Sequence, residues 1–478
     1  MKKFNLALIS PGREGSVVSG RWKGMVNFYR LTLPLLAGLT PKDRYTISIF
    51  DECVDTIPLD RDFDLVAMSV MTAYAPRAYE LCRNLQKRGS IVVLGGHHPT
   101  LLPTEAMEYA DTVAIGDAEA IWPQILQDFE KGILQKIYHG TDIGADFNRS
   151  LYPDRYSVKQ KSMLVFNTVE TSRGCPYLCD YCTIASFYKS SYRKYSIESV
   201  MRDIESTNGK YIFFVDDNLI GGNAQDRNRT KELLRALIPL NKRWFCQATV
   251  KFADDEELLS LAALAGCVGV YLGLESISTE SLNEVRKGWN KPESYSERIK
   301  RIRSAGIAIE AGLIFGFDHD NRDVFKRTAE FIIQTGIESP NGHLLTPYPG
   351  TPLFDRMQSE KRILTYDWSL YNTGNVVFKP LKMTPDELFE GYVNWYQKMF
   401  STSTIVERLT KANFPYYTAL IGLAKAIEVR RREFHIRKTT IDSKTCPTNL
   451  IIDCGAIPET FNSTERHSFD TINVQTTL

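Results

Sequence analysis

The sequence predicts an α/β protein in which a doubly wound parallel sheet precedes a longer series of β/α units. Two observations lead to this class. Short runs rich in Val, Ile and Leu alternate with amphipathic helical runs from the N-terminus to about residue 350, which is the pattern of parallel strands joined by helices. The 478 residues also exceed the usual size of a single core, so we expect two or three domains.

The N-terminal part, residues 1–135, contains five predicted strands separated by helical runs. Between the third and fourth strands, residues 77–87 place apolar side chains at helical spacing. Ligands of doubly wound sheets bind outside the carboxyl ends of the strands, so residues that follow the strands are candidate ligand contacts. The predicted strands are Asn5–Ser10, Thr46–Asp51, Asp64–Val70, Ile91–Gly95 and Thr112–Ile115.

Small and polar residues gather after three of these strands. Paired glycines in such a position let the backbone approach a bulky ligand. His97 and His98 follow one glycine pair, although a loop histidine bonded to the backbone is the commoner situation. The candidate ligand contacts are Ser69, Thr72, Gly95, Gly96, His97, Gly116 and Glu119.

Three cysteines, Cys175, Cys179 and Cys182, form a short loop after the first strand of the second part, which begins near Val165. Four-iron clusters normally take four thiolates, so three close cysteines without a fourth leave one iron open for a ligand. A structural zinc loop is the alternative. Zinc takes four ligands, usually as two short-spaced pairs, and no second pair follows here.

Composition excludes several classes of protein and partner. The chain has 43% hydrophobic and 24% charged residues and a net charge of +1, which is ordinary for a soluble protein and gives no reason to expect a nucleic acid as partner. No signal peptide or membrane span is expected. Nine scattered cysteines are a poor disulfide framework, so we expect a reducing, cytoplasmic location.

Residues 171–182, with an aromatic Tyr181 before the last cysteine, resemble the signature of the radical S-adenosylmethionine (SAM) enzymes. The resemblance implies a [4Fe–4S] cluster on the three cysteines, SAM on the open iron, and an electron donor of the flavodoxin or ferredoxin type. It also implies a partial (β/α)6 barrel over residues 165–365, with active residues at the carboxyl ends of its strands. The later predicted strands are Tyr211–Val215, Phe245–Val250, Val270–Leu274, Ala308–Phe315 and His343–Thr346.

The same resemblance assigns SAM contacts to the ends of the barrel strands. An acid of the pair Asp216 and Asp217 stands where the family contacts the SAM amino group, and Glu275 is the best candidate for the ribose or carboxylate. Arg173 is expected to offset the charge of the thiolate-rich cluster. The full set of expected SAM contacts is Tyr181, Asp216, Asp217, Gln247, Glu275, Ser276 and Gly316.

Residues 1–135 resemble the cobalamin-binding domain that precedes the barrel in one branch of this family. In many cobalamin carriers a histidine in the loop after the first strand ligates cobalt. The corresponding loop here, residues 11–16, has none. Residues 136–164 are expected to be a linker, 366–440 a mostly helical C-terminal extension like that of tetrapyrrole- and hopanoid-modifying members, and 441–478 a disordered polar tail.

Together these resemblances imply a cobalamin-dependent radical SAM methyltransferase that methylates an unactivated carbon of its substrate. An apolar substrate such as a tetrapyrrole or a lipid is compatible with the sequence. A cobalamin-linked oxidoreductase or cyclase is one alternative. A methylthiotransferase is another, although such enzymes have three more cysteines in the N-terminal domain and an RNA-binding barrel. A cluster-binding sensor without turnover is the non-enzymatic alternative.

Overall fold

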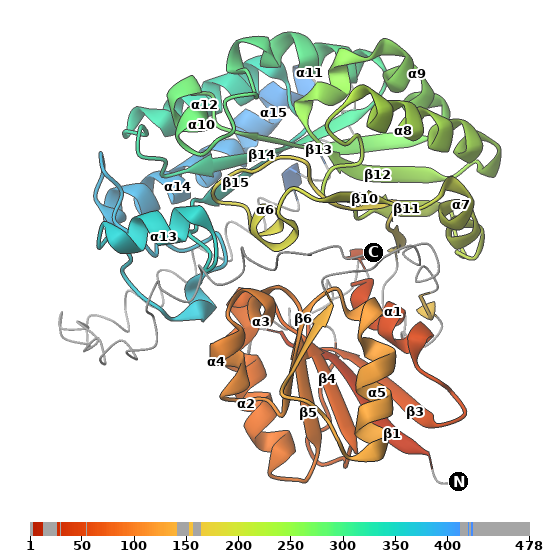
Figure 1. Ribbon diagram of the computed structural model, residues 1–478. Coiled ribbons are helices and arrows are strands. Elements are labelled where there is room, and N and C mark those ends of the chain that lie inside the picture. Colours follow the sequence, from red (N-terminus) through yellow and green to blue (C-terminus); the bar gives the residue numbers. More distant parts are fainter. Residues whose placement is uncertain are drawn as a thin grey trace, which may run out of the picture. The chain divides into compact units, whose positions relative to one another are not determined.

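The computed structural model describes residues 3–12, 26–28, 30–53, 55–140, 153–155, 164–411, 419 and 422–423. These residues form two parallel sheets, which confirms the α/β prediction (Figure 1). None of the described helices is long and apolar enough to cross a membrane. The polar tail that we expected over 441–478 lies outside the described residues.

The first sheet has six parallel strands and the order of a doubly wound fold. The order is β3 (Tyr45–Asp51), β1 (Phe4–Ser10), β4 (Leu65–Ser69), β5 (Ile91–Gly95), β6 (Thr112–Gly116) and β7 (Ile137–Gly140). After β1, the chain first adds β3 on one side of β1 and then adds β4 and the later strands on the other side. This reversal creates a switch point between β1 and β4.

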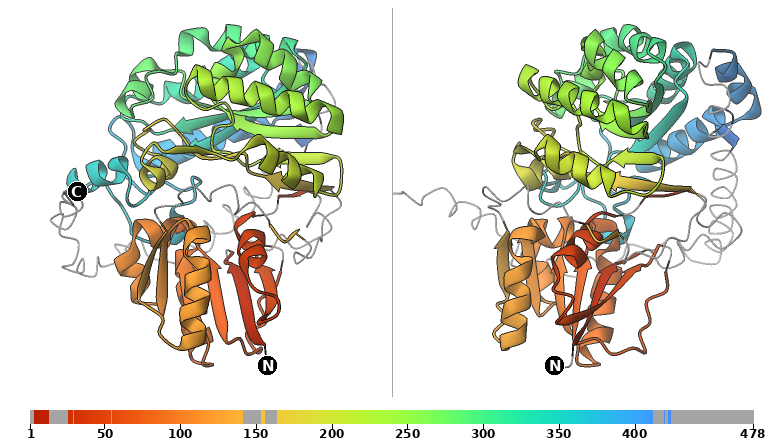
Figure 2. Two further views of the ribbon diagram at one scale, coloured as in Figure 1. Left: turned by 45° about the vertical axis from the view of Figure 1, so that its right-hand side comes forward. Right: turned by 90° about the vertical axis from the view of Figure 1, so that its right-hand side faces the viewer.

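Helices lie on both faces of this sheet (Figure 2). Because the strands are buried on both faces, they are nearly continuously apolar, and each face has its own hydrophobic core. The helices are α1 (Thr32–Leu39), α2 (Ala75–Gln86), α3 (His97–Leu101), α4 (Pro103–Met107) and α5 (Trp122–Lys131).

The second sheet has seven parallel strands, and its helices cover one face (Figure 1). Its strand order is β15 (Ser339–Leu344), β14 (Ala308–Phe315), β13 (Cys267–Glu275), β12 (Arg243–Ala248), β11 (Tyr211–Phe214), β8 (Leu164–Val169) and β2 (Val26–Phe28). The helices are α7 (Ile197–Glu205), α8 (Ala224–Leu237), α9 (Glu256–Leu264), α10 (Thr279–Glu284), α11 (Tyr295–Ser304) and α12 (Asp323–Thr335).

Sheet membership differs from the sequence prediction at two short strands. β2 comes from the N-terminal part but pairs with β8 of the second sheet, and β7 extends the first sheet beyond residue 135. Three or four residues are too few to show a hydrophobic period. The last barrel strand also begins earlier than expected, at Ser339 rather than His343, because Ser339 to Leu344 pair in register with β14.

The C-terminal extension packs on the first sheet as well as on the second. Trp368, Tyr371 and Val377 of the extension, with Phe354 of the preceding helix α13 (Pro352–Ser359), join the core on the α2 face of the first sheet. The indole nitrogen of Trp368 donates to Glu105 at 3.0 Å. Tyr371 is fully buried there. The helical run after Pro385 is two helices, α14 (Pro385–Met399) and α15 (Thr402–Lys411).

Candidate functional site

The three clustered cysteines lie at the carboxyl end of β8. The chain passes through the short strand β9 (Ser172–Gly174), makes the cysteine loop and enters α6 (Thr183–Tyr188). β9 pairs with β10 (Tyr192–Lys194) in an antiparallel hairpin. All three thiols are free, and Cys179 is buried. The loop therefore presents three thiols at the edge of the sheet where parallel barrels place their active residues.

The three cysteines are candidate ligands of a multi-iron cluster. Among the described residues, no three side chains of His, Cys, Asp or Glu converge on one metal position. A zinc site needs four ligands within about 2.3 Å of one ion, whereas a cubane takes each thiolate on a different iron. Burial raises the pKa of the Cys175 thiol to about 12 and that of Cys179 to about 11, so both thiols must lose protons when a cluster binds.

Two neighbouring aspartates after β11 accept hydrogen bonds from the residues that lead into the cysteine loop. Asp216 is fully buried and accepts bonds from the Thr171 amide at 3.1 Å and the Thr171 hydroxyl at 2.7 Å. Asp217 accepts the amide of Gly174 at 3.1 Å. Gly174 has φ +86°, and a Cβ there would lie 2.2 Å from the Ser191 carbonyl oxygen. The position immediately before Cys175 therefore requires glycine.

A cavity of about 220 Å³, the cysteine cavity, opens beside the three cysteines. Four buried polar atoms on its wall have no hydrogen-bond partner among the described residues: Tyr177 Oη, Asn218 Oδ1, Thr249 Oγ1 and Trp289 Nε1. Buried polar groups are almost always paired, so this wall suits a polar ligand. The other lining residues are Cys175, Cys179, Tyr181, Cys182, Ile184, Asp217, Gln247, Ala248, Tyr271, Gly273, Glu275 and Lys287.

A buried ion pair lies on the same wall. Lys287 Nζ is 2.7 Å from Glu275 Oε1 and 3.3 Å from the Tyr181 hydroxyl. Glu275 has φ +64°, a strained conformation for a residue with a side chain, and such strain clusters at functional sites. Trp289 stacks on Tyr177 with ring centroids 3.9 Å apart. These aromatic rings form part of the cavity wall beside the cysteine loop.

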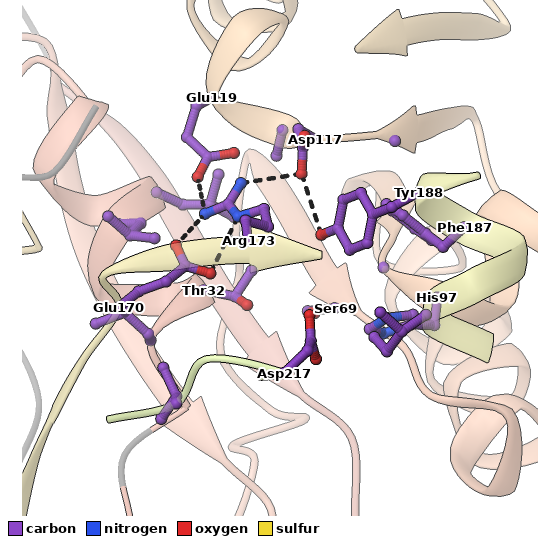
Figure 3. Close-up of a pocket in the computed structure, with 18 residues that line it drawn as sticks. Thr32, Ser69, His97, Asp117, Glu119, Glu170, Arg173, Phe187, Tyr188 and Asp217 are labelled. Atoms are coloured by element: carbon purple, nitrogen blue, oxygen red, sulfur yellow. Dashed lines mark hydrogen bonds and ion pairs between the residues drawn. The ribbon is translucent and has the colours of Figure 1, made fainter. Parts of the chain in front are cut away.

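A second cavity, of about 250 Å³, lies at the carboxyl edge of the first sheet, and we call it the sheet-edge cavity (Figure 3). The ends of β4, β5 and β6 and residues of the cysteine-loop region line it. The lining residues are Leu31, Thr32, Leu35, Leu36, Ser69, Gly96, His97, Gly116, Asp117, Ala118, Glu119, Glu170, Arg173, Ile184, Phe187, Tyr188, Val215 and Asp217.

Arg173 occupies one side of the sheet-edge cavity and bonds to three carboxylates (Figure 3). Its guanidinium lies 2.9 Å from Asp117, 2.7 Å from Glu119 and 2.6 Å from Glu170. Arg193 is a second cation on Asp117. The expectation that Arg173 offsets the charge of the cluster is therefore wrong, because its charge is already balanced by these acids.

The two histidines of the glycine-rich loop have different surroundings. His98 is fully buried, and its Nε2 lies 3.0 Å from the Tyr79 hydroxyl and 3.4 Å from Glu105. His97 lines the sheet-edge cavity beside Phe187, and its buried Nε2 has no hydrogen-bond partner in the described part of the chain. Burial lowers the pKa of His97. His98 is thus a structural residue, and His97 presents a neutral imidazole to the cavity.

The structure brings most of the predicted site residues together. Tyr181, Asp217, Gln247 and Glu275 line the cysteine cavity, whereas Asp216, Ser276 and Gly316 do not. Ser276 bonds within its own turn, and Gly316 packs against Leu388 and Phe378. Around the sheet-edge cavity lie Ser69, Gly96, His97, Gly116 and Glu119, while Thr72 and Gly95 lie outside its wall.

Asp217 and Ile184 line both cavities. Burial and the nearby Glu170 raise the pKa of Asp217 to about 7. Because these two side chains form a wall common to both cavities, a ligand in one is separated from a ligand in the other by a single layer of side chains.

Sequence reasoning missed several residues of the two walls. Lys287, Trp289 and Thr249 contribute to the cysteine cavity, and Glu170 contributes to the sheet-edge cavity. None belongs to a short motif, and Lys287 meets Glu275 only through the turn after α10. A glutamate and a lysine separated by a helix carry no signal in one sequence.

Three family models match successive parts of the chain. The radical SAM superfamily model matches residues 169–332, the B12 binding domain matches residues 37–126, and a domain of unknown function (DUF4070) matches residues 351–437. The first two cover the residues that line the two cavities, except those at 31–36 in the sheet-edge cavity.

Characterised relatives extend the likeness over most of the chain. The bacteriochlorophyllide d C-12(1)-methyltransferase of Chlorobaculum tepidum is 31% identical over 394 residues, which is 79% of this chain and 84% of that protein. The anaerobic magnesium-protoporphyrin IX monomethyl ester cyclase of Cereibacter sphaeroides is 26% identical over 379 residues, 70% of this chain and 60% of that protein.

A solved structure has the same fold. The radical SAM methyltransferase TsrM from Kitasatospora setae, with cobalamin and a [4Fe–4S] cluster bound, superimposes with a TM-score of 0.66. The likeness covers 90% of this chain and 100% of that one at 16% identity. At this identity the likeness concerns the fold alone.

Proposed function

The chain belongs to the cobalamin-dependent radical SAM methyltransferase family, and from this premise we propose that it methylates an unactivated carbon of an apolar ring substrate. The observation that carries the proposal is the wall of Asp217 and Ile184 that the two cavities share. A substrate carbon held at this wall lies next to both cofactor sites. Proximity of this kind replaces an encounter in solution.

We assign the cluster and SAM to the cysteine cavity and cobalamin to the sheet-edge cavity. Cys175, Cys179 and Cys182 would hold the [4Fe–4S] cluster, and the cysteine cavity would hold SAM. The residues of the sheet-edge cavity, His97 among them, would hold cobalamin. When bound, the cluster supplies the electron that cleaves SAM and cobalamin supplies the methyl group.

The polar residues of the cysteine cavity orient SAM. Asn218 Oδ1 and Thr249 Oγ1 have no partner in the described chain and Gln247 adds an amide to the wall, while the Glu275–Lys287 pair presents one charge of each sign. SAM carries an ammonium and a carboxylate, so this pair matches its charges. Trp289 and Tyr177 exclude water from the cluster side.

The apolar part of the sheet-edge cavity favours a flat, apolar substrate. Leu35, Leu36, Ile184 and Phe187 are among its lining residues. A tetrapyrrole is the first substrate class that we propose, because the 31% identical relative is named for a bacteriochlorophyllide. A polycyclic lipid is the second class, and a hopanoid methylase is also among the relatives.

Ring closure or oxidation without methyl transfer is the alternative activity, because a cyclase is among the relatives. We propose to distinguish the two with methyl-deuterated SAM and a panel of tetrapyrroles and hopanoids, using anaerobically reconstituted protein. Deuterium in the ring product supports methylation, and an oxidised product without deuterium supports the alternative. Absence of 5′-deoxyadenosine and of labelled product with every substrate contradicts both.

We further propose a flavodoxin- or ferredoxin-type protein as electron donor, and a reducing cytoplasm as the location. Leu178 of the cysteine loop is 46% exposed, which gives a donor protein access to the loop. If flavodoxin reduces the wild-type cluster but not that of Leu178→Asp, while dithionite reduces both, the donor docks at this loop. Equal reduction of both proteins by flavodoxin would contradict this docking position.

A further inference from the structure

Arg30 lies at the switch point of the first sheet. Its guanidinium donates to the Ser10 hydroxyl at the end of β1 and lies over the ring of Tyr74, 5.4 Å from the centroid, in the segment that follows β4. Its Nη2 is 3.6 Å from the sulfur of Cys53, which follows β3. Open α/β sheets bind ligands in the crevice at this point of the strand order.

The guanidinium of Arg30 has no carboxylate within 4.0 Å among the described residues, unlike those of Arg77 and Arg173. Nearby acids are engaged elsewhere. Glu52 pairs with Arg77 at 2.7 Å and accepts the Gly12 amide at 2.9 Å, and Asp51 accepts the amide of Cys53 at 3.1 Å. Half-buried charges are normally paired, so Arg30 has a free capacity for an anion.

The ligand chemistry follows from the guanidinium. Its planar fork matches the oxygens of a phosphate. Cobalamin carries one anionic group of this kind, the phosphodiester that joins the corrin side chain to its nucleotide. We propose that Arg30 binds this phosphodiester at the switch point. The inference rests on the proposed function, because it takes the ligand of the first sheet to be cobalamin.

The binding of three corrinoids tests the proposal. Cobalamin has the phosphodiester and the base, cobinamide phosphate has the phosphate without the base, and cobinamide has neither. We expect Arg30→Gln in the full chain to weaken cobalamin and cobinamide phosphate by about tenfold and to change cobinamide by less than about twofold. Arg30→Lys keeps the charge and loses the fork, so its effect is smaller. Equilibrium dialysis gives all the affinities.

The matched control removes an arginine from the opposite end of the same sheet. Arg88 precedes β5 and pairs with the exposed Asp62 at 2.6 Å, so Arg88→Gln leaves all three affinities unchanged. Iron content and circular dichroism check the fold of each variant, and Arg30→Lys carries the test if Arg30→Gln does not fold.

Two outcomes overturn the assignment of Arg30. Equal weakening of all three corrinoids means that Arg30 supports the corrin site as a whole, and unchanged affinities mean that it does not contact the cofactor. A wild-type chain that binds none of the corrinoids contradicts the proposed cobalamin function itself, and the Arg30 inference fails with it. Failure at Arg30 with wild-type cobalamin binding leaves the proposed function intact.

Discussion

The two cavities, which share the wall of Asp217 and Ile184, differ in how their polar groups are satisfied. Four buried polar atoms of the cysteine cavity have no partner in the described chain, whereas the charged groups of the sheet-edge cavity bond to one another around Arg173. A ligand of the first cavity gains hydrogen bonds that the protein leaves unmade. In the second cavity His97 Nε2 is the one such atom among the described lining residues, so a ligand there gains mainly from shape and apolar contact.

Removing one cysteine thiol should have the largest effect, and the effect should be confined to the ligands of the cysteine cavity. We expect Cys179→Ala to lose nearly all of about four irons per chain and SAM cleavage with them, while cobalamin is retained, because Cys179 lines only the cysteine cavity. Iron analysis and absorbance of bound cobalamin measure both. Cys267→Ala removes another buried thiol, at the start of β13 and outside the cysteine cavity, and should keep the iron. Loss of cobalamin together with iron would mean that the cavities are not independent.

Arg173→Gln tests the paired network of the sheet-edge cavity. It leaves Asp117, Glu119 and Glu170 without their shared cation, and breaking a buried ion pair costs about 3–5 kcal/mol. We expect a clear fall in the denaturant midpoint.

Arg193→Gln is the control for this change. Its guanidinium also bonds to Asp117, but its side chain is 23% exposed, so the loss of stability should be much smaller. Equal losses in the two variants would show that Arg173 is not the centre of the network.

The same two cavities show which site residues can be predicted from the sequence alone. That Cys175, Cys179 and Cys182 line one cavity could be predicted because all three lie within one short loop. The strand ends could be predicted because hydrophobic runs mark them, and Ser69, Gly96 and Gly116 follow from that. Lys287 and Arg30 could not, because each meets its partners only after distant elements have packed. Asp216 and Asp217 are adjacent in sequence, and only the fold separates their roles.

Glu284 provides a buried polar atom that belongs to neither cavity. Its Oε2 has no hydrogen-bond partner in the described residues, and burial together with the charge of Asp318 raises its pKa to about 7. A carboxyl group whose pKa is raised on folding makes the folded protein less stable as the pH rises from about 4.5 to 7, because the folded state must then hold the charge. Glu284→Gln should therefore raise the free energy of unfolding by on the order of 2 kcal/mol relative to wild type at pH 8 and change it little at pH 4.5.

The pH dependence of Glu284→Gln should not change when SAM is added, because no cavity ligand reaches this residue. Thermal unfolding at both pH values, with and without SAM, measures this. A gain that disappears with SAM would place Glu284 in contact with the ligand site.

The smallest effect concerns two buried threonines of the barrel. Thr249 has an unpartnered hydroxyl on the cysteine cavity, whereas the Thr230 hydroxyl donates to the carbonyl of Leu219 at 3.0 Å. Thr249→Val removes no protein hydrogen bond, so unfolding should change by less than about 0.5 kcal/mol. SAM affinity should fall about fivefold, because one ligand hydrogen bond of about 1 kcal/mol is lost.

Thr230→Val should show the opposite pattern, with about 1 kcal/mol of stability lost and SAM affinity unchanged. Calorimetric SAM titration and denaturant unfolding of both variants complete the test. If Thr249→Val destabilises the SAM-free chain as much as Thr230→Val does, its hydroxyl already has a partner such as water. The cysteine cavity would then be no less satisfied than the sheet-edge cavity, and SAM would have to displace that partner to bind.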